Sequence, residues 1–460
     1  MENEPKIPIN ILITHGFLIS MDAGLSIIQD GAIAIEGSRI AAIGTTSTLE
    51  SQYQPQQIID ASGMFVMPGL INTHTHSGDI LFRGLVEDLP LESWLEQLWV
   101  AENHFINAES VGWGARLAYI EMVRSGITTA LDMFWFPYEL AQAAKEVGFH
   151  LATGFVFFDS PIADGMLPKE RYRLARQFLT QYACDELIIP AVQPHSVYTV
   201  STENLKQASK LAQEFGTLFV THASETLTEV RNCRRDYGCT PIQYLDRLGA
   251  LTPRTVLAHC VHLDSDEFDL LSQRGVSVAN CPVSNMKLAS GIANVSQMLL
   301  SGVNVTLGTD GPVSGNDLNL WYTMRLAALV QKTVNHDASL MSTKQVVSMA
   351  TREGAKALGI SAKTGSLEVG KQADIILVQT GRAHSTPSFD PYSSIVYSLG
   401  REDVETVLIN GRLVMYNRNL LTINETEVIE AVRQLGIQIA IYVSQPNQAE
   451  KSQTGIRRKE

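Results

Sequence analysis

The chain has 460 residues, of which 45% are hydrophobic and 18% are charged, a globular composition that excludes a peptide-sized or disulfide-stapled module. Its 35 Lys and Arg against 48 Asp and Glu leave a net charge of −13, so no global basic field is available for nucleic acid or an anionic membrane. We therefore expect a small-molecule substrate, with no nucleic acid and no membrane as partner, and leave a homo-oligomeric state open.

The N-terminal sequence, MENEPKIPIN, lacks the charged and then apolar pattern of a secretory signal, and no apolar run reaches membrane-spanning length. These features predict a cytoplasmic protein. The five cysteines include no C-x-x-C pair, so we expect reduced, mostly buried thiols instead of disulfides.

Residues 1–62 predict short strands with no helix between them. The stretch NILITHGFLISMD alternates apolar and polar positions, DGAIAIEGSRIAAIG predicts a hairpin around Glu36-Gly37, and QIIDASG follows.

From Phe65 onward, β-rich apolar runs alternate with helical segments, which is typical of βα units around a parallel sheet. The runs cover residues 65–76, 126–134, 150–159, 187–195, 217–225, 254–261, 276–282 and 303–310. Eight such runs are the number that closes a (β/α)8 TIM barrel. A doubly wound sheet is the alternative, but no G-x-G-x-x-G follows the first run. One intervening helix is predicted to begin at a Ser201/Thr202 cap and to end at Gly216.

Two helical stretches are predicted after the eighth run, over 317–334 and 342–359. The segments TGSLEVGKQADIILVQ and DVETVLINGRLVMYN that follow have the alternation and turn residues of β-strands. These strands resemble the N-terminal ones, so we predict an α/β fold in which both chain ends form one small β-sandwich domain beside the barrel. The predicted domains are 1–64 with 363–422 for the β-sandwich, 65–362 for the barrel, and 423–460 for a C-terminal helix (424–443) and a polar tail from Gln445.

Polar residues gather at the carboxyl ends of the runs, the rim where barrel active sites form. They are His74, His76, Asp132, Asp159, His195, His222, Glu225, His259 and Asp310. An H-x-H pair alone more often has a packing or surface role, and Asp310 alone is compatible with a turn before Gly311. Because His74 and His76 are two apart on a strand, they point to the same side, and in a closed barrel His222 and Asp310 would converge with them. Three imidazoles and a carboxylate predict one first-row divalent ion, Zn²⁺ by default, with Fe²⁺ or Mn²⁺ as alternatives.

Two further residues are candidates for proton transfer. Glu225 lies three residues beyond His222, where a carboxylic acid can move protons between an activated water and a leaving group; the alternative is an N-cap or first-turn acid of the helix TLTEVRNC. His259 fits a second metal ligand, a water-orienting base or a buried hydrogen-bonded histidine. Two-metal barrels usually add a bridging lysine on a mid-barrel strand, and because LIIPAVQPH contains none, we favour one ion with His259 as the base.

Seven segments follow one another in a specific order: VMPGLINTHTH, SGITTALDM, THASET, LAHCVHL, NCPVSNMKLASG, TLGTDG and GSLEVGKQADIILV. In this order and spacing the chain resembles the amidohydrolase superfamily, in its aminohydrolase branch, from about Ile11 to Leu420. It is most similar there to the 5′-methylthioadenosine/S-adenosylhomocysteine deaminases, through RGLVEDLPLESWLEQ, QPHSVYTVS and SNMKLASGI.

The resemblance implies a barrel with a β-sandwich from both chain ends, and hydrolytic deamination of an adenine nucleoside with release of ammonia. The ligands it implies are His74, His76, His222 and Asp310. Glu225 would protonate the ring nitrogen beside the amino-bearing carbon, while His259 and Asp310 position the attacking hydroxide. Glu102 would bind the ribose hydroxyls and His195 would contact the substrate.

One departure concerns the 5′ substituent. Some family members place an arginine just after the third strand to hold the homocysteine carboxylate, whereas this chain has Gly154 there, with Arg171 or Arg173 as candidate substitutes. This leaves open an aminohydrolase acting on another N-heterocycle, namely guanine, an oxidised purine, a pterin or a triazine. A two-metal cyclic-amide hydrolase is also compatible with the motifs, although the absent lysine weakens that interpretation. A metal-free barrel that serves as an interaction scaffold would usually be marked by lost ligands.

Overall fold

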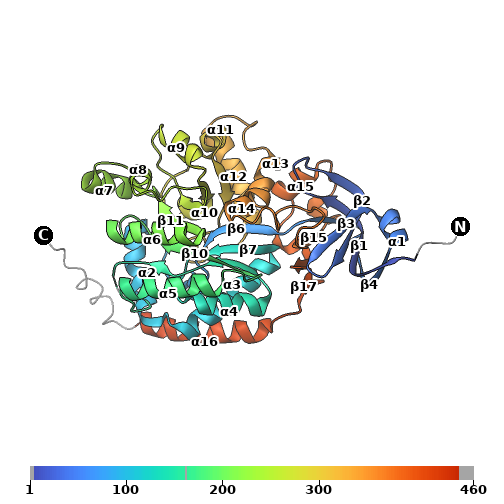
Figure 1. Ribbon diagram of the computed structural model, residues 1–460, viewed down its shortest axis with the longest axis horizontal. Coiled ribbons are helices and arrows are strands. Elements are labelled where there is room, and N and C mark those ends of the chain that lie inside the picture. Colours follow the sequence, from blue (N-terminus) through green and yellow to red (C-terminus); the bar gives the residue numbers. More distant parts are fainter. Residues whose placement is uncertain (1–4, 161–162, 445–460) are drawn as a thin grey trace.

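The computed structural model describes residues 5–160 and 163–444, and it confirms a barrel accompanied by a sheet from both chain ends (Figure 1). The barrel lies to the left in that view. The second sheet, to the right, brings blue N-terminal strands beside red C-terminal ones. We refer to it as the terminal sheet.

The barrel strands are parallel and follow one another in chain order around the ring. They are β6 (Leu70–Thr75), β7 (Ile127–Asp132), β8 (His150–Thr153), β10 (Ile188–Pro194), β11 (Leu218–Ala223), β12 (Thr255–His259), β13 (Ser277–Asn280) and β14 (Asn304–Leu307), with the short β9 (Val156–Phe157) pairing beside β10. The ring closes between β14 and β6. There the Thr73 hydroxyl donates to the Leu307 carbonyl at 2.9 Å, and the Asp310 N–H donates to the His74 carbonyl at 3.0 Å.

Helices surround the barrel and several have the ends that the sequence indicated. Ser201 caps α6 through its side chain and Gly216 ends it in the left-handed conformation, as predicted. The helices up to β14 are α2 (Leu91–Phe105), α3 (Ala108–Arg124), α4 (Pro137–Val147), α5 (Pro168–Gln181), α6 (Thr202–Phe215), α7 (Leu227–Tyr237), α8 (Pro241–Arg247), α9 (Glu267–Arg274), α10 (Pro282–Lys287) and α11 (Val295–Leu300), with the 3-10 turn η1 (Ser77–Phe82) after β6.

The terminal sheet has nine strands drawn from both ends of the chain. They are β1 (Ile7–Ile19), β2 (Ile27–Glu36), β3 (Arg39–Thr45), β4 (Tyr53–Asp60), β5 (Met64–Pro68), β15 (Ile375–Gln379), β16 (Val404–Ile409), β17 (Arg412–Tyr416) and β18 (Asn419–Leu420). Glu36 pairs with Arg39 at the predicted hairpin. Alternate side chains of both chain ends form one apolar cluster, in which Ile13 and Ile33 meet Ile375 and Leu408.

The prediction of no helix in residues 1–62 is wrong, because α1 (Thr46–Gln52) follows β3. Thr45 caps this helix by accepting a hydrogen bond from the Thr48 N–H, and Leu49 is its buried apolar anchor. A single buried leucine in seven residues produces no helical periodicity, which is why the sequence pattern missed it.

The first predicted barrel run, 65–76, is in fact two strands. β5 belongs to the terminal sheet, where it pairs with β1 and β15, and the first barrel strand begins only at Leu70. Gly69 between them lies so close to Thr128 that a Cβ would fall 2.2 Å from its side chain. We therefore propose that the border between the sheet domain and the barrel lies at Gly69 instead of between residues 64 and 65.

Two other runs are also divided. Run 150–159 breaks at Gly154 into β8 and β9, and the stretch 342–359 forms two helices, α13 (Thr343–Met349) and α14 (Arg352–Ala357), after α12 (Leu320–Val334). The predicted C-terminal helix is α16 (Glu425–Val443), which follows α15 (Pro391–Tyr397) and runs beside α3 (Figure 1). The predicted polar tail from Gln445 lies outside the described residues.

The barrel and the terminal sheet are joined by a buried contact between a histidine and an aspartate. His150, on β8, lies 3.1 Å from the Asp374 carboxylate, which also accepts the Asn410 N–H at 2.7 Å. All five cysteines are free thiols and four of them are buried, in line with the prediction of reduced thiols.

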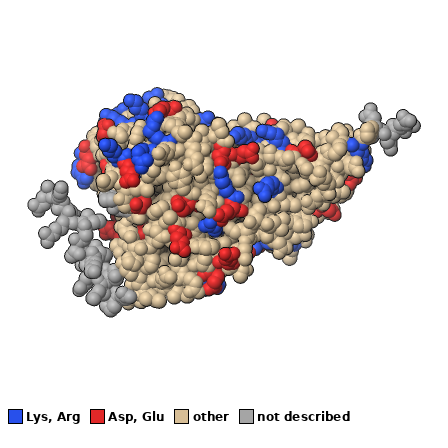
Figure 2. Space-filling view, turned by 60° about the horizontal axis from the view of Figure 1, so that its bottom comes forward, with Lys and Arg blue, Asp and Glu red and all other residues tan. Residues whose placement is uncertain are grey.

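The face of the molecule in Figure 2 carries acidic and basic side chains interspersed over a largely uncharged surface. Within the described part of the chain, no helix is long and apolar enough to cross a membrane.

Candidate metal centre and substrate pocket

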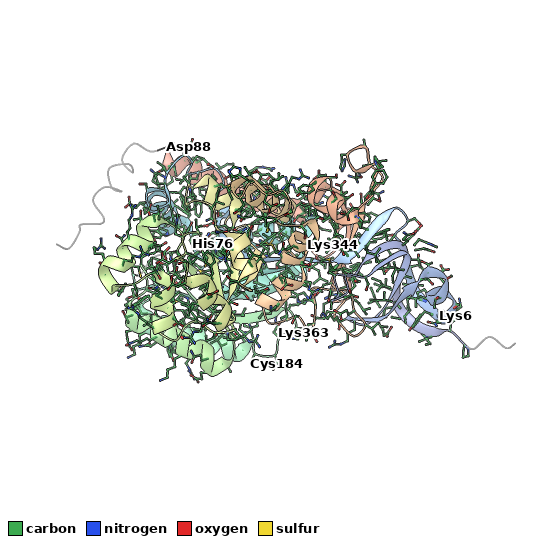
Figure 3. The ribbon with its side chains drawn as sticks, turned by 90° about the horizontal axis from the view of Figure 1, so that it is seen from above. Lys6, His76, Asp88, Cys184, Lys344 and Lys363 are labelled. Carbon is green, nitrogen blue, oxygen red and sulfur yellow. The ribbon has the colours of Figure 1, made fainter. Side chains whose placement is uncertain are left out.

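A cavity at the carboxyl ends of the barrel strands gathers the candidate residues. Its volume is ≈ 670 Å³, including space open to solvent. His76 lies inside the barrel part, far from Lys6 at the outer end of the terminal sheet (Figure 3). The predicted site residues that line the cavity are His76, Glu102, His195, His222, Glu225, His259 and Asp310. His74 is buried directly beside them, with its ring centroid 4.8 Å from that of His76.

Each of two histidines is oriented by a backbone carbonyl. His76 Nδ1 donates to the Met133 carbonyl at 2.6 Å, and His222 Nδ1 donates to the His195 carbonyl at 2.7 Å. Because a carbonyl only accepts, these bonds leave both Nε2 lone pairs directed into the cavity, where the two atoms lie 3.3 Å apart.

The carboxylate of Asp310 completes this cluster. Its Oδ1 lies 3.2 Å from His76 Nε2 and 3.5 Å from His74 Nε2. Asp310 has φ 61°, an unusual conformation for a residue other than glycine, and its N–H is held by the His74 carbonyl at the closure of the barrel.

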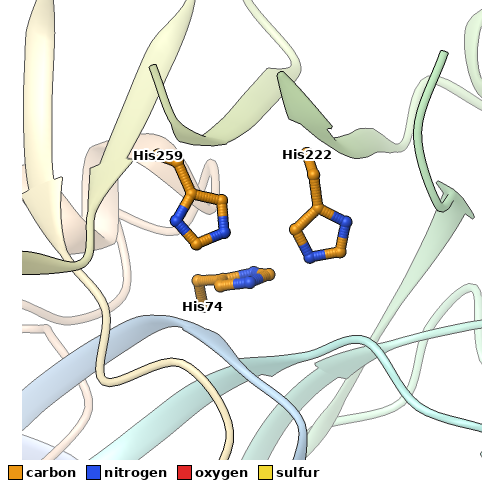
Figure 4. Close-up of side chains that lie close together, drawn as sticks. All are labelled: His74, His222 and His259. Atoms are coloured by element: carbon orange, nitrogen blue, oxygen red, sulfur yellow. The ribbon is translucent and has the colours of Figure 1, made fainter. Parts of the chain in front are cut away.

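These donors fit a divalent metal ion. Neither ring nitrogen of His74 has a hydrogen-bond partner among the described residues, although the side chain is buried. Two overlapping groups have ligand atoms within 4.8 Å of one another, namely His74, His76 and Asp310, and His74, His222 and His259. Figure 4 shows the rings of the second group approaching one another from separate strands. Three or more nitrogen and oxygen donors around one buried point are the set that Zn²⁺ and similar ions prefer.

The electrostatics of the cluster also favour a cation. Burial lowers the pKa of His74 to about 4 and that of His195 to about 3, and neutral imidazole is the form that binds a metal. Burial opposes protonation of His76 as well, but the neighbouring Asp310 outweighs it and raises the pKa of His76 to about 9. Burial would raise the pKa of Asp310, yet the adjacent His74 and His76 hold it well below its usual range. The cavity therefore stabilises positive charge beside an ionised Asp310.

Glu225 occupies the cavity and is not a cap of the following helix. Thr226 is the N-cap of α7, and Glu229 is the acid in its first turn. The Glu225 carboxyl is buried, within 3.4 Å of the Ser290 hydroxyl, and burial raises its pKa to about 8. Its backbone N–H donates to the Glu229 carboxylate at 2.7 Å, so the helix start fixes the position of Glu225.

His259 lies beside two of the predicted ligands, with its ring centroid 5.4 Å from that of His74 and 5.5 Å from that of His222. Its Nε2 is 3.7 Å from a Glu225 oxygen, and its Nδ1 is bonded to the Asn285 amide at 2.9 Å. His259 and Cys260 both have positive φ, 75° and 47°, so the strand end turns sharply to aim this ring into the cavity. When the Asn285 amide is turned so that its oxygen, which has no other partner among the described residues, accepts from Nδ1, the His259 Nε2 lone pair is free to accept a proton from a water molecule beside it.

The far side of the cavity holds two carboxyl groups. Glu102, from α2, is buried and accepts a hydrogen bond from the Trp135 indole at 3.4 Å. Asp79 lines the cavity with Glu102, and burial raises the pKa of both carboxyls, each of which is further affected by the other. His195 lines the same cavity, with its Nδ1 bonded to the Thr199 hydroxyl at 3.0 Å.

Three residues at the site were not found from the sequence. Asp79 is on η1 and not at a strand end, so the search of the rim passed over it. Asn285 and Ser290 lie in the motif NCPVSNMKLASG, which was quoted for the resemblance but given no chemistry.

The role of Asp132 in the structure is to anchor the turn after His76. Asp132 accepts hydrogen bonds from the Ser77 N–H at 3.0 Å and from the Tyr119 hydroxyl at 2.8 Å. Asp159, also at the predicted rim, bonds instead to the start of α6 through the Ser201 N–H at 2.9 Å.

Comparison with known proteins gives consistent matches over nearly the whole chain. The model of the amidohydrolase family matches residues 65–414. A 5-methylthioadenosine/S-adenosylhomocysteine deaminase of Syntrophus aciditrophicus is 39% identical over 439 residues, 95% of this chain and 99% of that protein. A 5′-deoxyadenosine deaminase of Methanothermobacter thermautotrophicus is 40% identical over 433 residues, 94% of this chain and 97% of that protein. The zinc-bound crystal structure of an adenosine deaminase from Xanthomonas campestris superposes with a TM-score of 0.93 at 34% identity, covering 95% of this chain and 100% of that one.

Proposed function

The chain belongs to the amidohydrolase family, and we propose that it is a metal-dependent aminohydrolase that deaminates an adenine nucleoside. The observation that carries the proposal is the convergence, in one cavity, of a histidine and aspartate cluster with a buried glutamic acid. Relatives named for deamination of adenine nucleosides support the substrate class.

We propose His74, His76, His222 and Asp310 as the ligands of a single ion, most suitably Zn²⁺. When bound, such an ion supplies a nucleophile at neutral pH by lowering the pKa of a water molecule. The orphaned ring nitrogens of His74 support its place in the set. His259 is close enough to belong to a ligand group, but its position beside Glu225 supports the role of a base.

The reaction adds water to the amino-bearing carbon of the purine and expels ammonia, so one carbon–oxygen bond forms and one carbon–nitrogen bond breaks. Glu225, protonated below pH 8 by its raised pKa, donates a proton to the adjacent ring nitrogen. His259 and Asp310 orient the attacking water, and His259 takes one of its protons and passes it to the amino group, which leaves as ammonia. Glu102 accepts hydrogen bonds from the ribose hydroxyls, and His195 contacts the purine.

The test is ammonia release from metal-replete protein given 5′-methylthioadenosine, S-adenosylhomocysteine, adenosine, guanine and a triazine. We expect turnover of at least one adenine nucleoside and none of the other two classes. Turnover of guanine or the triazine alone would replace the proposed substrate class.

The metal assignment needs a second measurement, the zinc content of purified variants. We expect His76→Ala to lose both metal and activity, and His259→Asn to keep the metal while losing activity. Loss of metal from His259→Asn would move this residue into the ligand set.

A further inference from the structure

Among the described residues that line the substrate cavity there is no Lys or Arg, whereas the acids Asp79, Glu102, Glu225 and Asp310 face it. His76 is already occupied by the Asp310 carboxylate, which lies 3.2 Å from its Nε2. A substrate carboxylate buried there would therefore find no guanidinium or ammonium partner, and burying a charge without a partner is strongly unfavourable.

The position where the resemblance leads one to expect an arginine cannot hold any side chain in this fold. A Cβ on Gly154 would lie 1.8 Å from the carbonyl oxygen of Ala191 on the neighbouring strand β10. The Gly154 N–H also donates to the Gln193 side chain at 3.0 Å. Close approach of two backbones explains the glycine, so the missing arginine is a consequence of how β8 and β10 meet.

Neither of the two arginines nearby replaces it. Arg171 is fully buried behind the cavity wall, where it pairs with Asp164 and donates to the Val156 carbonyl at 3.0 Å. Its guanidinium lies 5.5 Å from the ring centroid of Trp135, so it supports that wall from behind. Arg173 points away and bonds to Gln177 at 3.2 Å on an exposed surface.

The remaining wall is apolar and aromatic. Its members are Leu91, Trp94, Leu98 and Trp99 from α2, together with Trp135 and Val156. Such a surface gains free energy by covering an alkyl or thioether group, which brings no charge to be desolvated.

We propose that this pocket selects adenine nucleosides whose 5′ substituent is uncharged, such as a methylthio group, and discriminates against those that carry a carboxylate, such as S-adenosylhomocysteine. The inference rests on the proposed deaminase function and narrows its substrate class. Charge, and not the length of the substituent, is the basis of the discrimination.

The experiment compares kcat/KM for four nucleosides with the wild-type holoenzyme. These are 5′-methylthioadenosine, 5′-n-butylthioadenosine, S-adenosylhomocysteine and its carboxamide. The butyl compound matches the chain length of homocysteine without its charges, and the carboxamide removes only the carboxylate. We expect S-adenosylhomocysteine to be at least 100-fold poorer than the butyl compound, and the carboxamide to recover at least tenfold.

Three results would overturn the proposal. The first is S-adenosylhomocysteine within threefold of both the butyl compound and 5′-methylthioadenosine, and the second is a carboxamide no better than S-adenosylhomocysteine. The third is a butyl compound as far below 5′-methylthioadenosine as S-adenosylhomocysteine is, which would assign the selectivity to length. Absence of turnover with all four and with adenosine would instead refute the proposed deaminase function itself.

A variant pair tests the two arginines directly. We expect Arg171→Gln and Arg173→Gln to leave the ratio of kcat/KM for S-adenosylhomocysteine and 5′-methylthioadenosine unchanged within twofold, even where Arg171→Gln lowers thermal stability. A selective tenfold fall of that ratio in either variant would identify a carboxylate-binding arginine and contradict the proposal. If Arg171→Gln does not fold, the four-substrate comparison still decides the matter.

Discussion

Replacing Glu225 with glutamine tests the proposed proton donor with the smallest structural change. The amide has the shape of the carboxylic acid and can still accept from the Ser290 hydroxyl, 3.4 Å away in the wild type. It cannot deliver a proton to the purine, and general acid–base catalysis by one side chain contributes about 10²–10⁴-fold. We therefore expect kcat to fall by about that factor, which corresponds to about 2.7–5.4 kcal/mol in the activation barrier, with the metal content unchanged.

The pH dependence of kcat gives a second test of the Glu225 carboxyl as proton donor. With a pKa of about 8, the Glu225 carboxyl is about nine-tenths protonated at pH 7 and loses its proton as the pH rises through 8. Since the protonated form is the active one, wild-type kcat should fall above pH 8. This alkaline limb should be absent from the residual activity of Glu225→Gln.

Glu229→Gln is the matched control, because Glu229 is a neighbouring buried acid with a pKa raised by burial to about 7 that does not line the cavity. Its role is to accept the Glu225 N–H at 2.7 Å, which an amide oxygen also does. We expect less than a tenfold change in steady-state ammonia release. A Glu225→Gln enzyme with near-normal kcat, or one whose loss Glu229→Gln matches, would remove Glu225 from proton transfer.

Other substitutions test the framework around the site. Asp132→Ala should weaken metal binding about 10–100-fold, because the turn after the H-x-H loses its anchor; competition with a chelator measures it, and unchanged affinity would refute the link. Asp374→Ala should lower the free energy of unfolding at pH 7 by about 3 kcal/mol, since two hydrogen bonds to a buried charge are lost. Burial by itself would raise the pKa of Asp374, but the charge of His150 lowers it. The stabilisation by this carboxylate is therefore present above its unfolded-state pKa and is lost as the pH falls through the folded-state value. In urea unfolding, the difference in free energy of unfolding between wild type and Asp374→Ala should disappear only in acid, below about pH 4. Gly154→Ala should destabilise by about 1–3 kcal/mol or prevent folding, because the new Cβ overlaps the Ala191 carbonyl; a thermal midpoint equal to wild type would show that the two strands can separate freely.

The barrel could be predicted from sequence because each of its strands is an apolar run bounded by loops, and eight such runs close only one common fold. The sequence did not show where a continuous apolar segment divides into two strands. Residues 65–71 contain no polar residue, yet the backbone turns at Gly69 from one sheet to another. Which sheet receives β5 is decided by pairing with β15, more than 300 residues away, and no local pattern carries that information.

Some residues of the site could likewise be predicted from the sequence and others could not. His74, His76, His222 and Asp310 could be proposed because strand ends are readable and the barrel brings them together. Asp79 could not, since it lies on a 3-10 turn whose place at the cavity depends on the packing of η1 against α3.

The orientation of the histidines that we propose as ligands depends on contacts that exist only in the assembled barrel. His76 and His222 each bond through Nδ1 to the carbonyl of the residue that directly follows the adjacent strand, Met133 after β7 and His195 after β10. In both cases the neighbouring strand, through its register, selects the tautomer and turns Nε2 toward the cavity. A shift of one residue in either pairing would turn the opposing residue to the other side and take its carbonyl out of reach of Nδ1. The sequence therefore specifies which residues can bind the ion, whereas the strand register determines that they present the correct nitrogen.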